Sequence, residues 1–450
     1  MNSSALATQP NHANLGRRLL VLGIALAAAV LLSASTWFYM NRILRAQQIA
    51  DAMAHHRPRG NLSDLYPRWL GARELLRHGR NPYSQEITRE IQQGYYGRPL
   101  DPARPQDPKD QQGFAYPVYV VFLLAPTVDF PFEVVETGFR WFLIALAAAS
   151  VFLWLRVVRW KLSFGFLCIL AILALGWLPT VQGIKLQQLS LLVAGLLAAC
   201  AASLAGGWLL AAGSLLALAT IKPQLTWPLI LWLLVWAVSR WRSRRRFVFG
   251  FVIVMMLLLA GAEWVLPGWL GMFVAGIGQY HRYTQNQSVL VWMFGVIAGR
   301  ILEVLCLIAA ATLGWRSRQQ PATSPEFGRA TALILALTVV IVPMFAPYNQ
   351  VLLLPAILVL MKSTAASQPL LPAFRLAGMI GLILLLWPWI ATLGLTAAYP
   401  WITPGLRQNL WPLPFYSNFM LPIFVFGLAV LDLWGNPSSS RGLRDGFAAE

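Results

Sequence analysis

Long apolar segments separated by short polar stretches dominate the pattern of hydrophobic and polar positions along this chain. A spanning helix needs about 17 to 25 mainly apolar residues to cross the roughly 30 Å hydrocarbon layer of a bilayer. The predicted spans are residues 19–40, 136–158, 162–178, 189–205, 208–221, 225–239, 247–266, 299–314, 330–346, 351–361, 376–398 and 415–434. The pattern therefore predicts an all-α polytopic membrane protein with about twelve transmembrane helices, the shorter of them tilted or broken.

One long polar stretch, at residues 41–113, separates the first predicted span from the second. The first span exceeds the apolar core of about 7–15 residues found in signal peptides, so we expect it to remain in the protein. Residues 114–130 are apolar but contain Pro117 and Pro126, so we expect a re-entrant or interfacial helix there. The predicted organisation is a cytoplasmic N-terminus (1–18), a first transmembrane helix (19–40), an extracytoplasmic loop with amphipathic and re-entrant helices (41–135), transmembrane helices 2–12 (136–434) and a cytoplasmic tail (435–450).

Basic residues predict the orientation of the chain in the membrane. The 35 Lys and Arg outnumber the 17 Asp and Glu, for a formal net charge of +18. They occur in short clusters beside apolar segments and form no basic domain, which argues against a nucleic-acid partner. With the N-terminus inside, the clusters at 156–161, 240–246, 316–318, 362–375 and 441–444 all face the cytoplasm. We therefore expect a multi-pass protein of the cell membrane whose large loop faces outward.

Residues 64–83, inside the large loop, carry the most distinctive local pattern. Apolar residues recur at the spacing of one helix face and arginines line another, with Leu65, Trp69, Ala72 and Leu76 on the first and Arg73, Arg77 and Arg80 on the second. This pattern predicts an amphipathic helix along the membrane surface, with arginines available to lipid phosphates. Asp64 stands just before the helix, either as a cap or as a functional carboxylate.

Carboxylates are scarce, which restricts where acid–base chemistry can occur. Eleven of the 17 lie between Asp51 and Glu136. On the predicted outer side only the first loop, Glu263 and Glu303 supply a carboxylate. Neither the histidines nor the three cysteines have the spacing of a metal site, and no cofactor motif is present, so we expect neither metal nor cofactor.

Other polar residues interrupt apolar surroundings or fill the predicted outer loops. An unpaired ammonium in an apolar region is costly, so Lys185 and Lys222 either reach the surface or bind an anionic ligand. The outer loops are rich in hydrogen-bonding side chains, which are either solvated or in contact with substrate. The candidate substrate-binding residues are Tyr66, Tyr116, Gln224, His281, Tyr283, Asn286 and Asn349.

These motifs together resemble glycosyltransferase family 87. The resemblance rests on the segment from Asp64-Leu-Tyr to Pro82-Tyr83 after an outward first span, on Phe114-x-Tyr-Pro, and on Lys222-Pro-Gln and Asn286-Gln-Ser. It implies the GT-C fold and a mannosyltransferase that uses a polyprenyl-phosphate sugar and transfers it to a lipid or glycan acceptor. It also implies that Asp64 is the single catalytic base of an inverting displacement.

A base of this kind needs cations for the departing phosphate, because negative charge builds there. The candidates, in order, are Lys222, Arg282 and Lys185. Two alternatives remain open: another GT-C pentosyl- or hexosyltransferase, and a flippase or transporter for lipid-linked sugars. A transporter should show internal repeats or paired intramembrane charges, and the sequence has neither.

Overall fold

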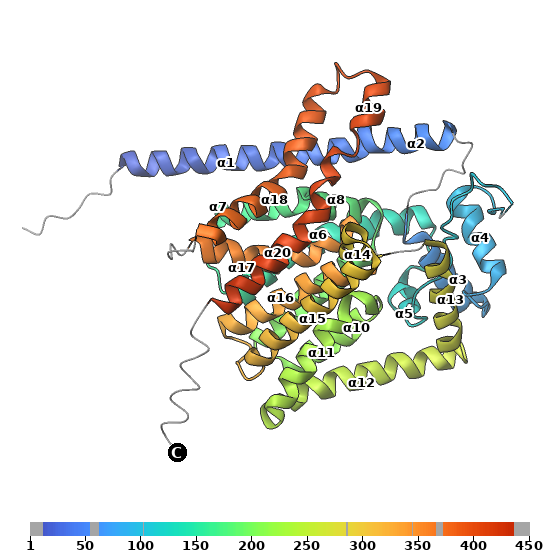
Figure 1. Ribbon diagram of the computed structural model, residues 1–450. Coiled ribbons are helices and arrows are strands. Elements are labelled where there is room, and N and C mark those ends of the chain that lie inside the picture. Colours follow the sequence, from blue (N-terminus) through green and yellow to red (C-terminus); the bar gives the residue numbers. More distant parts are fainter. Residues whose placement is uncertain are drawn as a thin grey trace, which may run out of the picture.

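The computed structural model describes residues 12–54, 63–101, 103–284, 287–343, 345–365 and 372–435. Throughout these residues the regular structure is helical, and no strand occurs in them (Figure 1). The first half comprises α1 (His12–Phe38), η1 (Tyr39–Leu44), α2 (Arg45–Ala54), α3 (Tyr66–His78), α4 (Gln85–Tyr96), α5 (Val120–Leu124), η2 (Ala125–Thr127), α6 (Phe132–Val158), α7 (Phe164–Gly176), α8 (Leu178–Lys185), α9 (Leu189–Ala205) and α10 (Leu209–Ala219). The second half comprises α11 (Pro223–Ser239), α12 (Trp241–Val265), α13 (Trp269–Thr284), α14 (Val289–Phe294), α15 (Val296–Ser317), α16 (Pro325–Ile341), η3 (Pro347–Leu353), α17 (Leu354–Ala365), α18 (Pro372–Ala398), α19 (Pro404–Leu410), η4 (Leu413–Phe415) and α20 (Ser417–Trp434).

The prediction of a polytopic helical membrane protein is confirmed. Within the described residues, seven helical segments are long and apolar enough to cross a membrane, or eight if one bent pair is a single span. Three further apolar helices are shorter: α9 and α11 have 17 residues each and α10 has 11. Because a perpendicular span needs about 20 residues, the count of twelve stays a prediction.

The bent pair is one of the shorter predicted spans, 162–178, and it is broken at its end. Helix α7 ends at Gly176 and α8 leaves it at an angle of 57°. Trp177 between them has an extended backbone (φ −70°, ψ 132°), and Pro179 occupies the first turn of α8. Proline is tolerated at a helix start but interrupts a helix that runs through it, so the sequence breaks the span here.

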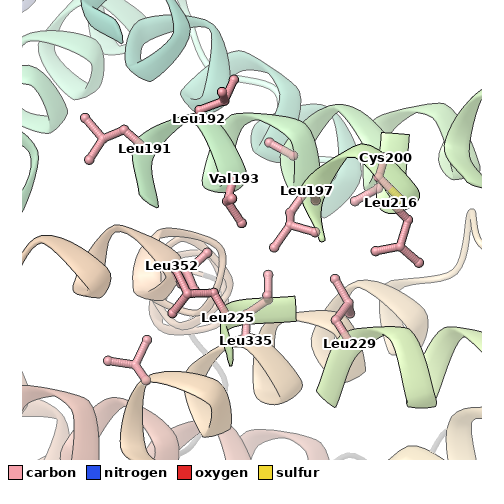
Figure 2. Packing of buried hydrophobic residues seen from close by; sticks show 14 of the residues in the cluster. Leu191, Leu192, Val193, Leu197, Cys200, Leu216, Leu225, Leu229, Leu335 and Leu352 are labelled. Carbon is pink, nitrogen blue, oxygen red and sulfur yellow. The ribbon is translucent and has the colours of Figure 1, made fainter. Parts of the chain in front are cut away.

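Two helices that are apolar on all sides form the centre of the bundle. Nearly all of α16 and most of α9 are buried, as expected for helices without a polar face. Figure 2 shows Leu191 and Leu197 of α9 facing Leu225 of α11 and Leu335 of α16. Cys200 is also buried in this core, in keeping with a packing role. The first residues of α9 and α11 and the last residues of α16 therefore come together at one end of the core.

The large loop packs beside this end of the bundle. The predicted helix at the start of the 64–83 segment is confirmed as α3, which ends at Gly79 in the left-handed conformation (φ 65°). The amphipathic pattern predicted that the apolar face of this helix lies on a membrane surface. In the structure that face is instead covered by protein. Leu65, Trp69 and Ala72 are buried, because α3 packs against α4 and α5. Helices α5 and η2, in the segment expected to be re-entrant, have five and three residues and are too short to span a bilayer.

Candidate active site

A cavity of about 260 Å³, called here the inner cavity, lies where the large loop meets the end of the bundle core. Its lining comes from the start of α3, residues 110–117, the starts of α9 and α11, the end of α13 and residues 342–349. The cavity brings together six of the residues selected from the sequence, namely Asp64, Tyr116, Lys222, Gln224, His281 and Asn349. These residues are up to 285 positions apart in the chain, so only the tertiary fold gathers them.

Asp64 is held at the entrance of α3 without capping it. The residue at the cap position is Leu65, and no side chain makes a capping hydrogen bond there. The Asp64 backbone N–H donates to the carbonyl of Leu186 over 2.8 Å, which ties this residue to the turn before α9. Its carboxylate accepts a hydrogen bond from Nε2 of Gln188. The capping interpretation therefore does not account for Asp64.

Lys222 is buried at the start of α11, with 6% of its surface exposed. Its Nζ donates to Oε1 of Gln188 over 2.9 Å and to Oγ of Ser190 over 2.7 Å. Ser190 in turn donates to Oδ1 of Asn349 over 2.8 Å. The Gln188 amide thus joins a carboxylate on one side to an ammonium on the other, because an amide can donate and accept at once.

Arg68 also lines the inner cavity, although its sequence pattern did not single it out. Its Cζ lies 4.6 Å from the centre of the Tyr116 ring, and its Nη1 donates to the backbone carbonyl of Asp64 over 3.0 Å. Its buried Nε has no hydrogen-bond partner among the described residues. The available signal was its position four residues after Asp64, which puts both on one face of α3.

The electrostatics of the cavity keep Asp64 ready to take up a proton. Burial raises the pKa of the Asp64 carboxyl above its ordinary value, and the cations of Arg68 and Lys222 lower that pKa in part. The nearby Asp110 raises it further, and burial also raises the pKa of Asp110 itself. A carboxylate with a raised pKa is a stronger base, so the arrangement suits proton abstraction from a hydroxyl group.

Both buried helix starts at the cavity favour an anion. Gln188 stands at the cap position of α9 and Lys222 at that of α11. The N-terminus of a helix carries unpaired N–H groups and a partial positive charge, which attract phosphates and carboxylates. Together with Lys222 and Arg68, which also line the cavity, these helix starts make the cavity suitable for an anion.

Other predicted site residues lie outside the inner cavity. Nζ of Lys185 donates to the carbonyl of Met40 over 2.5 Å, so it connects α8 to η1. The ring of Tyr66 packs against Trp69 and Phe132. Arg282 lines a second cavity of about 660 Å³, described below.

For two of the predicted substrate-binding residues the structure does not describe the side chain. Tyr283 lies in the last turn of α13, and its side chain is not among those described. Asn286 lies outside the described residues. Elsewhere in the described chain, no group of three or more His, Cys, Asp or Glu side chains could hold a metal ion. The inner cavity contains the carboxylates of Asp64 and Asp110 and the cations of Arg68 and Lys222.

Comparison with known proteins adds one finding. The sequence model of glycosyltransferase family 87 matches residues 114–347, just over half of the chain. The matched region includes Tyr116, Lys222 and Gln224, whereas Asp64 and Arg68 precede it. No curated protein and no solved structure matches the chain.

Proposed function

Since the chain belongs to glycosyltransferase family 87 and is a polytopic helical membrane protein, we propose that it transfers a sugar from a polyprenyl-phosphate donor to a lipid or glycan acceptor. Mannose is the first candidate for the sugar, and a GT-C-like architecture with about twelve spans is the proposed scaffold. The observation that carries the proposal is the inner cavity, in which the Gln188 amide bonds both the Asp64 carboxylate and the Lys222 ammonium.

Asp64 is the proposed catalytic base. In a single inverting displacement, the acceptor oxygen forms a bond to the anomeric carbon of the donor sugar. The bond from that carbon to the phosphate oxygen breaks, and its electron pair leaves with the polyprenyl phosphate. The acceptor proton passes to the carboxylate of Asp64. A phosphate is already a good leaving group, so one carboxylate suffices, in contrast to the two carboxyl groups that most glycosidases use.

Lys222 is the proposed donor-phosphate residue, with Arg68 as a second cation. The phosphate gains negative charge as the sugar leaves, and cations fixed in a dry cavity stabilise that charge in the transition state. The starts of α9 and α11 support the same side of the reaction. Tyr116, Gln224, His281 and Asn349 line the remaining walls and are proposed to contact the sugars.

The proposed reaction takes place on the extracytoplasmic side of the cell membrane. The five basic clusters favour this orientation, since they fall on the opposite side of the membrane from the large loop. A donor whose isoprenoid tail stays in the bilayer would present its phosphate at the end of the bundle core, where α9 and α11 begin.

The test is a donor assay with purified protein. Polyprenyl-phosphate-mannose should release polyprenyl phosphate when an acceptor fraction from the host membrane is present, and the sugar should appear on the acceptor. Polyprenyl-phosphate-glucose and polyprenyl-phosphate-arabinose, run in parallel, distinguish mannose from other sugars. Use of nucleotide sugars alone as donors would exclude this function, and movement of the lipid-linked sugar across vesicles without transfer would favour a flippase.

A further inference from the structure

The second cavity, of about 660 Å³, lies directly beside the inner one. Its walls come from α4 and the loop before it, from residues 111–115 and from α13. Gly113 and Ala115 line both cavities, so the two cavities adjoin at this stretch of the chain. The catalytic functions assigned above to the inner cavity do not use this larger space.

The second cavity has a lining suited to carbohydrate. Five of its lining residues carry amides: Asn81, Gln85, Gln92, Gln111 and Gln279. Asn81, Gln92 and Gln111 also hydrogen-bond within the chain, which fixes their orientation, and amides can donate to and accept from sugar hydroxyl groups. Tyr83 and Thr88 add an aromatic face and a hydroxyl. An isoprenoid chain cannot form hydrogen bonds with these groups, so a hydrophilic occupant fits this lining better.

The charge of the second cavity has one sign. Arg89 on α4 and Arg282 on α13 line it, whereas no Asp or Glu does. Both side chains are exposed, and neither forms an ion pair within the described part of the chain. This differs from the inner cavity, whose two cations face Asp64 and Asp110. Two guanidinium groups without carboxylate partners favour an anionic ligand.

We propose that the second cavity is the acceptor subsite and that its occupant is an anionic glycan. This inference rests on the function proposed above, because it assigns the acceptor of that reaction. The donor phosphate requires the cations of the inner cavity, which leaves the larger adjoining space for the acceptor. A glycan lying there reaches Asp64 past the segment Gly113–Ala115, with its anionic group between Arg89 and Arg282.

Gly276 allows the location to be tested. It lines the second cavity, and a Cβ added to it would meet only Cδ1 of Tyr83, at 3.9 Å. A phenylalanine at this position therefore fills cavity space without striking the backbone. We expect Gly276→Phe to raise the acceptor KM about tenfold or more, as a lost set of contacts would, while the KM for polyprenyl-phosphate-mannose stays unchanged. Gly278→Phe is the matched control, since Gly278 is on the same helix, does not line the cavity and has no atom within 4 Å of its Cβ position.

The negative charge of the acceptor is tested with acceptor prepared from the host membranes. Membranes from cells that lack this protein are divided into a chloroform–methanol extract and an aqueous extract, and each is passed over an anion exchanger. We expect acceptor activity in the retained fraction of one extract, which also shows whether the anionic glycan is a lipid headgroup or water-soluble. Replacing both Arg89 and Arg282 with glutamine should raise the KM for that fraction at least about tenfold.

Each outcome separates the inference from the function it rests on. Acceptor activity in the unretained, neutral fractions overturns the anionic class. An unchanged acceptor KM in Gly276→Phe, or equal losses in Gly276→Phe and Gly278→Phe, overturns the location. In both cases the wild-type protein still transfers sugar, so the proposed function stands. If the wild-type protein releases no polyprenyl phosphate with any fraction, the function itself fails and the inference fails with it.

Discussion

Two sets of charged residues lie at the two ends of helix α3, and their charges are paired in different ways. The outer set is an ion-pair cluster in which Arg80 pairs with Glu74 at 2.7 Å, Glu86 at 3.0 Å and Glu90 at 2.5 Å. The inner set, at the other end of the helix, consists of Asp64 and Arg68 beside Lys222 and Gln188. Asp64 and Arg68 of the inner set and Glu74 and Arg80 of the outer set all occur in the 64–83 segment, so the sequence pattern alone does not separate the two sets.

The two sets differ in how many of their charged and polar atoms have an ion-pair or hydrogen-bond partner. In the outer cluster three carboxylates surround one guanidinium; Glu86 and Glu90 are exposed to water, which screens their charges, whereas Glu74 is buried and paired with Arg80. In the inner set the carboxylate is held by an amide, and Arg68 retains a buried Nε without a partner among the described residues. Buried polar groups are normally satisfied, so the incomplete pairing of Arg68 agrees with the proposal that the inner set, of the two, binds the ligand.

The largest expected effect comes from removing the base. Asp64→Asn keeps the shape of the side chain but cannot accept a proton, so kcat should fall about 10²- to 10⁴-fold, the usual contribution of general-base catalysis. Donor binding, measured separately by equilibrium binding of polyprenyl-phosphate-mannose, should remain. The matched change in the outer cluster, Glu74→Gln, should keep most of the activity. Full activity in Asp64→Asn, or a comparable loss in Glu74→Gln, would reverse the assignment of the two sets.

The next effect concerns the cations. Lys222→Met removes an ammonium that hydrogen-bonds Gln188 and Ser190, and kcat should fall about 10²-fold, as when one donor to a developing negative charge is lost. Lys185→Met is the comparison, because the Lys185 ammonium donates to the carbonyl of Met40 and does not line the inner cavity. Steady-state kinetics with the donor varied check both. An equal loss of kcat in the two variants would contradict a specific role of Lys222, and a larger loss in Lys185→Met would place the donor phosphate nearer to Lys185.

The smallest expected effect is a displacement of the pH profile by Gln188→Glu. Activity requires ionised Asp64, so the rate rises with pH through the pKa of that carboxyl. The variant removes the amide that donates to Asp64 and puts a second carboxyl beside it, and both changes raise the apparent pKa of the pair. The acid limb of kcat/KM should move upward by about one to three pH units.

Apart from the carboxyl that the substitution adds, the charged and titratable groups around Asp64 are the same in the wild type and the variant. Arg68, Lys222, Asp110, Tyr116 and Tyr348 all influence it or are influenced by it. Gln187→Glu, whose amide instead donates to the carbonyls of Ile184 and Lys185, should leave the acid limb in place. An acid limb that does not respond to Gln188→Glu would mean that Gln188 does not set the protonation of the base.

Much of this protein could be predicted from its sequence because hydropathy acts locally. Each of the twelve apolar segments contains a helix, since an apolar run of this length buries its backbone polar groups by forming its own hydrogen bonds. Asp64 and Lys222 could be selected because a carboxylate in a chain with few of them, and a lysine in apolar surroundings, are each costly without a purpose. Composition and local pattern carry that information directly.

The tertiary structure alone decided which polar groups meet. Gln188 is 124 residues from Asp64 and 34 from Lys222, and its amide connects them only because the starts of α9 and α11 lie at one end of the buried core. The same packing left Arg282 in the second cavity and directed Lys185 to Met40, although the sequence offered both, like Lys222, as cations for the donor phosphate. It also covered the apolar face of α3 with α4 and α5, where the amphipathic pattern suggested a membrane surface. Hydrophobicity specifies that a face is buried, but the partner that buries it depends on how distant helices pack, which local sequence does not encode.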